Sequence, residues 1–259
     1  MYKLYVDPSY GVHVNILSPT ALTNTRSVDN RREMWIYYPG QREIEVRVSP
    51  QKFRLPTDRR VKMVERNFVL SVRGTDESVA GRSVYVVDLK SKNGGVGNRA
   101  LYVDREKGNI LRSTLSDGKE NMNLLETVTV NYDVKLKKEE FRKPAGVEKK
   151  LWGPVDLAKF SNSSKKLGFA PRFPVSVPRG FEVTHKQVLG SDAMPYFVAR
   201  LSDGMNSIAV YQWSPKIWKG ESPFQGVKTS TDAYGIRYFA DGDASKSITQ
   251  EILRSFVLR

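Results

Sequence analysis

The sequence contains no cysteine, which excludes disulfide bonds, thiolate metal sites and cysteine nucleophiles. It has only two histidines, His13 and His185, and neither has a second ligand type nearby at the spacing of a metal site. The sequence around them lacks the nucleophile elbow of a serine hydrolase. We therefore interpret both as strand-surface histidines, expect no cofactor, and regard a hydrolase with an unusual site as the weakest of three functional hypotheses.

Long hydrophobic runs are also missing, since none approaches the ~18 residues of a membrane-spanning helix. Strand-like sequence begins at Tyr2, so an export signal, if the protein is exported, lies outside this sequence. Acidic residues are in deficit: 42 Lys and Arg against 28 Asp and Glu leave a net charge of +14. This balance favours anionic partners such as acidic proteins, phosphate-bearing lipids or nucleic acid.

Nucleic acid is the least favoured of these partners, because the sequence has no motif of a β-sheet with base-stacking aromatic residues, no helix-turn-helix and no zinc-binding pattern. The densest basic stretch, from Lys52 to Arg66, is interpreted as a solvated face. The glycine-rich run from Ser91 to Asn98 lacks the ending of a phosphate loop and is followed by strand-like sequence, so we interpret it as a hairpin loop. Glu139 and Glu140 lie in a basic stretch and are expected to be exposed to solvent, with no catalytic role.

What the sequence does contain is a series of short Tyr-, Phe-, Val- and Thr-rich runs separated by Gly, Asn, Asp and Pro. Alternation of apolar and polar residues predicts half-buried strands joined as an antiparallel meander, without a long helix among them. The hairpin at 32–50, with its turn at 39–41, and the run at 126–136 have the clearest two-residue period. The expected strands of the first half are 2–7, 11–17, the two arms of 32–50, 67–74, 83–90, the two arms of 99–119, and 126–136.

The composition shifts after residue 136 to a charged stretch broken by Pro144 and Gly146. We expect a β domain at 1–140, a linker at 141–153, and a small α+β domain at 154–259. The expected elements of the last domain are a short helix from about Asp156, strands at 181–190, 194–204, 206–213 and 235–240, and a closing helix at 247–258.

Met34, Trp35, Ile36, Tyr37 and Tyr38 make one strand apolar on both faces. Such a strand must be covered twice: by the core on one face and by a helix, a partner or a bound apolar ligand on the other. The alternation of side chains prevents all five from facing inward. Trp213 and Trp218 flank Pro215 in a loop-like segment, where they would serve either as exposed interface anchors or as packing beneath the loop.

Several longer phrases resemble a known family. The segments 29–46 (DNRREMWIYYPGQREIEV) and 102–120 (YVDREKGNILRSTLSDGKE) resemble the LolA-like fold of lipoprotein carriers and the N-terminal domain of MucB/RseB proteins, which regulate anti-sigma factors in the envelope stress response. The segments 157–183 and 194–212 are similar to the small C-terminal domain of MucB/RseB proteins. No single motif is specific, so the resemblance rests on their order along the chain.

The resemblance implies a mainly β protein whose first domain is a curved antiparallel half-barrel, holding an acyl chain or a hydrophobic peptide on its concave face. Residues 34–38 are then the expected ligand contacts, and Trp213 and Trp218 the expected partner contacts. The family's first helix and strand have no counterpart before Tyr2, so either the sequence begins inside that domain or its covering element differs.

The function implied is that of a non-enzymatic, periplasmic or extracytoplasmic sensor that binds an anti-sigma factor or another membrane-tethered partner. Contact with a membrane surface is compatible with the positive charge. The alternative hypothesis is a periplasmic carrier of lipoproteins or lipids.

Overall fold

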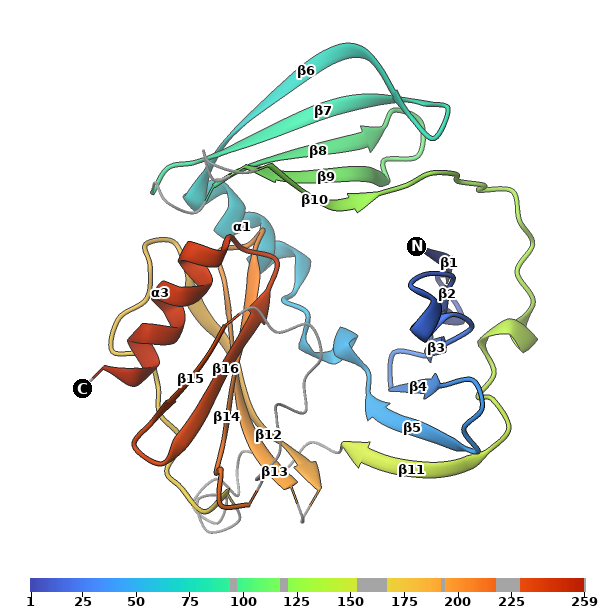
Figure 1. The fold of residues 1–259 in the computed structure, drawn as a ribbon. Coiled ribbons are helices and arrows are strands. Elements are labelled where there is room, and N and C mark those ends of the chain that lie inside the picture. Colours follow the sequence, from blue (N-terminus) through green and yellow to red (C-terminus); the bar gives the residue numbers. More distant parts are fainter. Residues whose placement is uncertain (94–96, 117–120, 153–166, 192–193, 218–228, 259) are drawn as a thin grey trace. The chain divides into compact units, whose positions relative to one another are not determined.

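The computed structural model describes residues 1–93, 97–116, 121–152, 167–191, 194–217 and 229–258. These residues form three sheets with few helices (Figure 1), which confirms the predicted mainly β class with a smaller α+β part. The chain divides into two compact units, the first comprising residues 1–54, 133–166 and 187–195, and the second residues 55–132, 167–186 and 196–259. No helix among the described residues is long and apolar enough to cross a membrane.

The sheet of the first unit is a meander of five antiparallel strands with a sixth strand added in parallel to the last of them. Its turns follow the predicted chemistry, since Gln41 N donates to the Tyr38 carbonyl where the hairpin bends. Short 3-10 helices connect or follow the strands: η1 (Thr20–Leu22), η2 (Pro50–Phe53) and η3 (Lys138–Phe141). The strands are β1 (Tyr2–Asp7), β2 (Gly11–Ile16), β3 (Arg26–Asp29), β4 (Glu33–Tyr37), β5 (Glu43–Val48) and β11 (Val147–Trp152).

Strand β11 lies within the segment predicted to be a linker, where it pairs with β5 over residues 43–47. Both compact units combine residues from before and after this segment. The domain boundaries at 140 and 154 stay a prediction. The helix predicted from Asp156 lies outside the described residues.

The second unit contains an antiparallel sheet in the order β10-β9-β8-β7-β6. It is preceded by α1 (Thr57–Asn67), which the sequence analysis did not predict. Its strands are β6 (Phe68–Val79), β7 (Arg82–Ser91), β8 (Asn98–Asp104), β9 (Ile110–Ser116) and β10 (Asn121–Glu126). The basic side chains of α1 are exposed as expected, but Met63 and Asn67 are buried on the opposite side.

A third sheet has the order β12-β13-β14-β16-β15. Helix α3 (Lys246–Val257) begins at Ser245, whose hydroxyl caps it by accepting from Ile248 N, and packs against β15 and β16 (Figure 1). This helix was predicted, with the residues of its apolar stripe buried: Ile248, Ile252, Leu253 and Phe256. The strands are β12 (Glu182–Ser191), β13 (Met194–Ser202), β14 (Ser207–Trp213), β15 (Thr229–Ala233) and β16 (Ile236–Gly242).

The prediction of a strand at 126–136 is wrong, although apolar and polar residues alternate there more regularly than anywhere else in the sequence. Past Glu126, where β10 ends, these residues belong to no sheet. Val130 packs against the cluster of Val79, Val84 and Leu111 in the second unit, whereas Val128 is 69% exposed. A two-residue period places apolar side chains on one face and polar side chains on the other. A strand also needs a neighbouring strand with free backbone groups to complete its hydrogen bonds.

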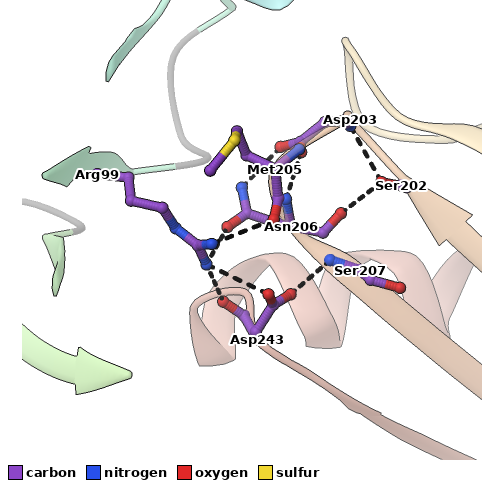
Figure 2. Close-up of polar contacts among 8 residues, drawn as sticks. Arg99, Ser202, Asp203, Met205, Asn206, Ser207 and Asp243 are labelled. Carbon is purple, nitrogen blue, oxygen red and sulfur yellow. Dashed lines mark hydrogen bonds and ion pairs between the residues drawn. The ribbon is translucent and has the colours of Figure 1, made fainter. Parts of the chain in front are cut away.

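A buried polar network joins β8 to the turns of the third sheet within the second unit (Figure 2). Arg99, 7% exposed, donates to the Met205 carbonyl at 3.1 Å and to Asn206 Oδ1 at 3.0 Å, and forms an ion pair with Asp243 at 3.3 Å. Asn206 in turn donates to both oxygens of Asp203, from its backbone N at 2.6 Å and its Nδ2 at 2.7 Å.

Asp203 is 1% exposed, and burial raises the pKa of its carboxyl against the opposing effect of these hydrogen bonds and of Arg99. Asn67, the last residue of α1, donates to the carbonyls of Asp203 and Gly180, both at 2.8 Å. The network therefore ties α1, β8 and the β13–β14 turn into one unit.

Candidate functional site

A cavity of about 530 Å³ lies on one face of the β1–β5 sheet. Strand register explains its floor, because Lys3, Asn15, Arg26, Tyr37 and Ile44 are paired in one row across the five strands. Tyr5 and His13 belong to the next row on the same face, two residues away along each strand. The lining residues are Tyr5, His13, Asn15, Asn24, Arg26, Tyr37, Glu140, Pro144 and Ala145.

Arg26 connects the floor of this cavity to its cover. Its Nε donates to His13 Nε2 at 3.0 Å, and its Nη2 donates to the Glu140 carbonyl in η3 at 2.8 Å. Phe141, the next residue, is 5% exposed and packs with Val28 and Trp35. The segment that covers the cavity, η3, is thus held to the sheet by the buried Phe141 ring and by the Arg26 guanidinium.

His13 is only 8% exposed, so its prediction as a strand-surface residue is wrong. Its ring stacks on Tyr5 with centroids 5.0 Å apart. Burial, with a further contribution from the Arg26 charge, lowers the pKa of His13 to about 4, so the ring is neutral at pH 7. Because Nε2 accepts from Arg26, we assign the single ring proton to Nδ1.

Two buried polar atoms of this cavity have no hydrogen-bond partner among the described residues. One is His13 Nδ1, a donor in the tautomer assigned above, and the other is Glu140 Oε2, an acceptor. The expectation of a fully exposed Glu140 is therefore wrong, since η3 folds back over the sheet. With its Nε2 already bonded to Arg26, His13 is not available as a general base. Among the described residues no group of three metal-ligating side chains is present.

Comparison with solved structures places this arrangement in a known fold. A crystal structure of MucB matches with a TM-score of 0.57 and 14% identity, covering 94% of this chain and 86% of that one. The Pseudomonas aeruginosa MucA/MucB complex matches with a TM-score of 0.58, 14% identity and coverage of 97% and 85%. A further complex of MucB with MucA(peri) gives 0.51, 13%, 98% and 90%. The chain has the fold of MucB.

This MucB-like fold agrees with the resemblance found in the sequence. No protein-family model matches the sequence, and no curated protein matches it either. The likeness therefore lies in the three-dimensional arrangement over almost the whole chain, at an identity that establishes the fold alone.

The five predicted ligand contacts are distributed over both faces of β4 and the residue after it. Tyr37 lines the cavity. Trp35, on the same face, is 9% exposed and belongs to the core with Val28, Ile44, Val46 and Phe141. Met34 and Ile36 are half-buried on the opposite face, and Tyr38 is half-buried at the turn. Ligand binding by residues 34–38 stays a prediction, and Tyr37 is the residue that the cavity favours.

Of the predicted partner contacts, Trp218 lies outside the described residues. Trp213 is 2% exposed and packs edge-on against Phe239, with centroids 5.7 Å apart. The prediction of an exposed interface anchor at Trp213 does not fit this burial. Trp213 is the last residue of β14, and its side chain belongs to the core of the β12–β16 sheet of this MucB-like fold.

Sequence reasoning missed most polar residues of the cavity. Asn15, Asn24 and Arg26 are ordinary strand and turn residues in the sequence, and only the pairing of β1, β2 and β3 brings them together. The alternation of β2 was visible, but it assigned the valines to the buried face and His13 to the exposed one.

The lowered pKa of His13 predicts a pH dependence of stability. The unfolded histidine titrates near 6.5 and the folded one near 4, so between these values the unfolded state binds more protons. The free energy of unfolding should therefore fall by at most about 3 kcal/mol as the pH drops from 6.5 to 4, and level off below that for this group. Urea unfolding of His13→Gln should show a shallower dependence of the free energy of unfolding on pH in this window than the wild type. Identical pH slopes in the two proteins would contradict the assignment.

Proposed function

We propose that this chain is a non-enzymatic, extracytoplasmic regulator that binds a membrane-tethered protein of the anti-sigma factor kind. The observation that supports this most strongly is the likeness to MucB over 94–98% of the chain. MucB has been crystallised in complex with MucA, so this fold serves protein–protein binding in that case. The net charge of +14 suits an acidic partner or a site of action close to an anionic membrane surface.

We further propose that the cavity on the β1–β5 sheet holds the ligand that is sensed. Tyr5 and Tyr37 offer aromatic contact, and the side-chain amides of Asn15 and Asn24 offer hydrogen-bond donors and acceptors. A peptide group supplies both an acceptor and a donor, whereas a bare acyl chain supplies neither. The chemistry of the cavity therefore favours a hydrophobic peptide over an acyl chain as its ligand.

Affinity capture would test the regulatory proposal. The full chain is immobilised and incubated with detergent-solubilised membrane proteins from its source, and retained proteins are identified by mass spectrometry. We expect a membrane-anchored protein with an extracytoplasmic segment, and direct binding of that purified segment in calorimetry. Native mass spectrometry of the chain purified without detergent reports the bound ligand. Recovery of lipid without any membrane protein would contradict regulation and favour the alternative of a carrier.

A further inference from the structure

A second cavity, of about 720 Å³, lies entirely within the second unit. One wall is the irregular segment from Gly168 to Phe173, and the other is formed by Ser214 and Lys216 after β14 and by the turn between β15 and β16. Tyr234 and Gly235 in that turn both have positive φ, 55° and 69°, as a tight two-residue hairpin turn requires. The turn geometry therefore fixes where the Tyr234 ring stands.

A buried side chain clamps the irregular wall. Gln212, 0% exposed, donates from Nε2 to the Arg172 carbonyl at 2.7 Å, and its Oε1 accepts from Arg172 N at 2.8 Å. A side-chain amide that pairs with both backbone groups of one residue replaces the hydrogen bonds that a neighbouring strand would supply, and it fixes the backbone of Arg172. The position of Arg172 is thus built into the fold.

The guanidinium of Arg172 is also held in place. Its central carbon lies over the Tyr234 ring, 4.2 Å from the ring centroid, in a cation–π contact. Arg172 also interacts with the Tyr238 side chain, which opposes the rise that burial causes in the pKa of Tyr238. A guanidinium carries five N–H groups, so it keeps donors for a ligand beside this interaction. A pre-organised guanidinium edge of this kind is suited to a planar carboxylate, which it binds with two parallel hydrogen bonds.

The described part of the lining has one sign of charge. Among the lining residues that the structure describes, Arg172 and Lys216 are cationic and none is an aspartate or glutamate. Next to the cavity, Lys186 Nζ stands 4.3 Å from the centroid of the Phe173 ring. The rings of Phe173 and Tyr234 remain 40% and 53% exposed, so apolar contact surface adjoins the cations. Positive charge beside exposed aromatic rings matches a segment in which carboxylates and apolar side chains alternate.

We propose that this cavity binds an acidic, apolar-flanked peptide segment of a protein partner, with a carboxylate on the edge of Arg172 and a second acidic group near Lys216. This inference rests on the proposed function, since it names the chemistry of the partner. Its site lies in the second unit, separate from the ligand cavity of the β1–β5 sheet.

Fluorescence anisotropy with the full chain and a labelled peptide of alternating glutamate and leucine would test the proposal. The double variant Arg172→Glu/Lys216→Glu should weaken binding by about tenfold or more, the factor expected for losing one charge-assisted contact. Lys246→Glu serves as the control for surface charge, because Lys246 is exposed at the start of α3, where a glutamate is tolerated. It should change the affinity less than twofold.

The conservative variant Arg172→Lys separates bidentate recognition from charge alone. It keeps the charge but lacks the planar edge, so we expect a loss of several-fold for the peptide. Glutamine in place of glutamate in the peptide should abolish the difference between wild type and the double variant. Circular dichroism of every variant excludes loss of folding as the cause.

The proposal would be overturned if the double variant and Lys246→Glu weakened peptide binding equally. It would also be overturned if the double variant weakened binding to phosphatidylglycerol vesicles and left binding to the peptide unchanged. The capture experiment distinguishes the two levels of inference. A membrane partner that the double variant retains as well as wild type overturns this site and leaves the proposed function standing. Wild type that captures no membrane partner contradicts the proposed function, whereas the peptide measurements test the cavity independently.

Discussion

Replacing Arg99 with methionine is expected to lower the free energy of unfolding by about 3–5 kcal/mol, the range for removing one partner from a buried charged network. The guanidinium donates to the Met205 carbonyl and to Asn206 Oδ1, and its positive charge favours the ionised form of the buried Asp203 carboxyl (Figure 2). Methionine fills a similar volume but donates no hydrogen bond, so these groups lose their partner without access to water. Urea-induced unfolding followed by far-UV circular dichroism measures the loss.

Arg73→Met is the matched control, because Arg73 also pairs with an aspartate on a neighbouring strand of the same sheet. In its ion pair with Asp88 the Arg73 side chain is 51% exposed and the Asp88 side chain 35% exposed, so water screens the pair and we expect a change below about 1 kcal/mol. Comparable losses in the two variants would contradict the view that the Arg99 network holds α1, β8 and the β13–β14 turn together.

Trp35→Ala is expected to destabilise the first unit by about 3–5 kcal/mol, the cost of truncating a large buried aromatic side chain. The indole packs against neighbours on both adjoining strands, Val28 and Val46, and against Phe141 from the covering segment. Its loss should therefore also loosen the cover of the ligand cavity. Thermal unfolding followed by near-UV circular dichroism reports the change.

Met34→Ala provides the comparison on the same strand, since Met34 is half-buried on the opposite face. We expect a loss of at most about 1–2 kcal/mol, because part of the side chain is already in water. A larger effect at Met34 than at Trp35 would show that the two faces of β4 have been assigned the wrong way round.

The sequence predicted those elements that depend on residues close together in the chain. The β4–β5 hairpin was predicted from alternation and a Pro39-Gly40 turn, and α3 from apolar residues at helical spacing. Helix α1 was missed because it has few apolar residues and a basic exposed face, so its hydrophobic stripe is too narrow to stand out.

The candidate site was harder to predict than the fold, because pairing between distant segments creates it. Arg26 and Glu140 are separated by more than a hundred residues, yet the Arg26 guanidinium bonds the Glu140 carbonyl. Tyr37 could be proposed from the aromatic cluster around it. The burial of His13 could not, since a histidine between valines on a strand matches an exposed position equally well.

The parallel pairing of β11 with β5 has a consequence for biosynthesis. Residues 55–132, which contain all five strands of the β6–β10 sheet, are translated after β5 and before β11. During synthesis the β5 edge therefore stays without its neighbour until a whole further sheet has left the ribosome, and closing so long a loop is slow. A chain arrested before Val147 would present that bare edge to other nascent chains, where strand-to-strand aggregation begins.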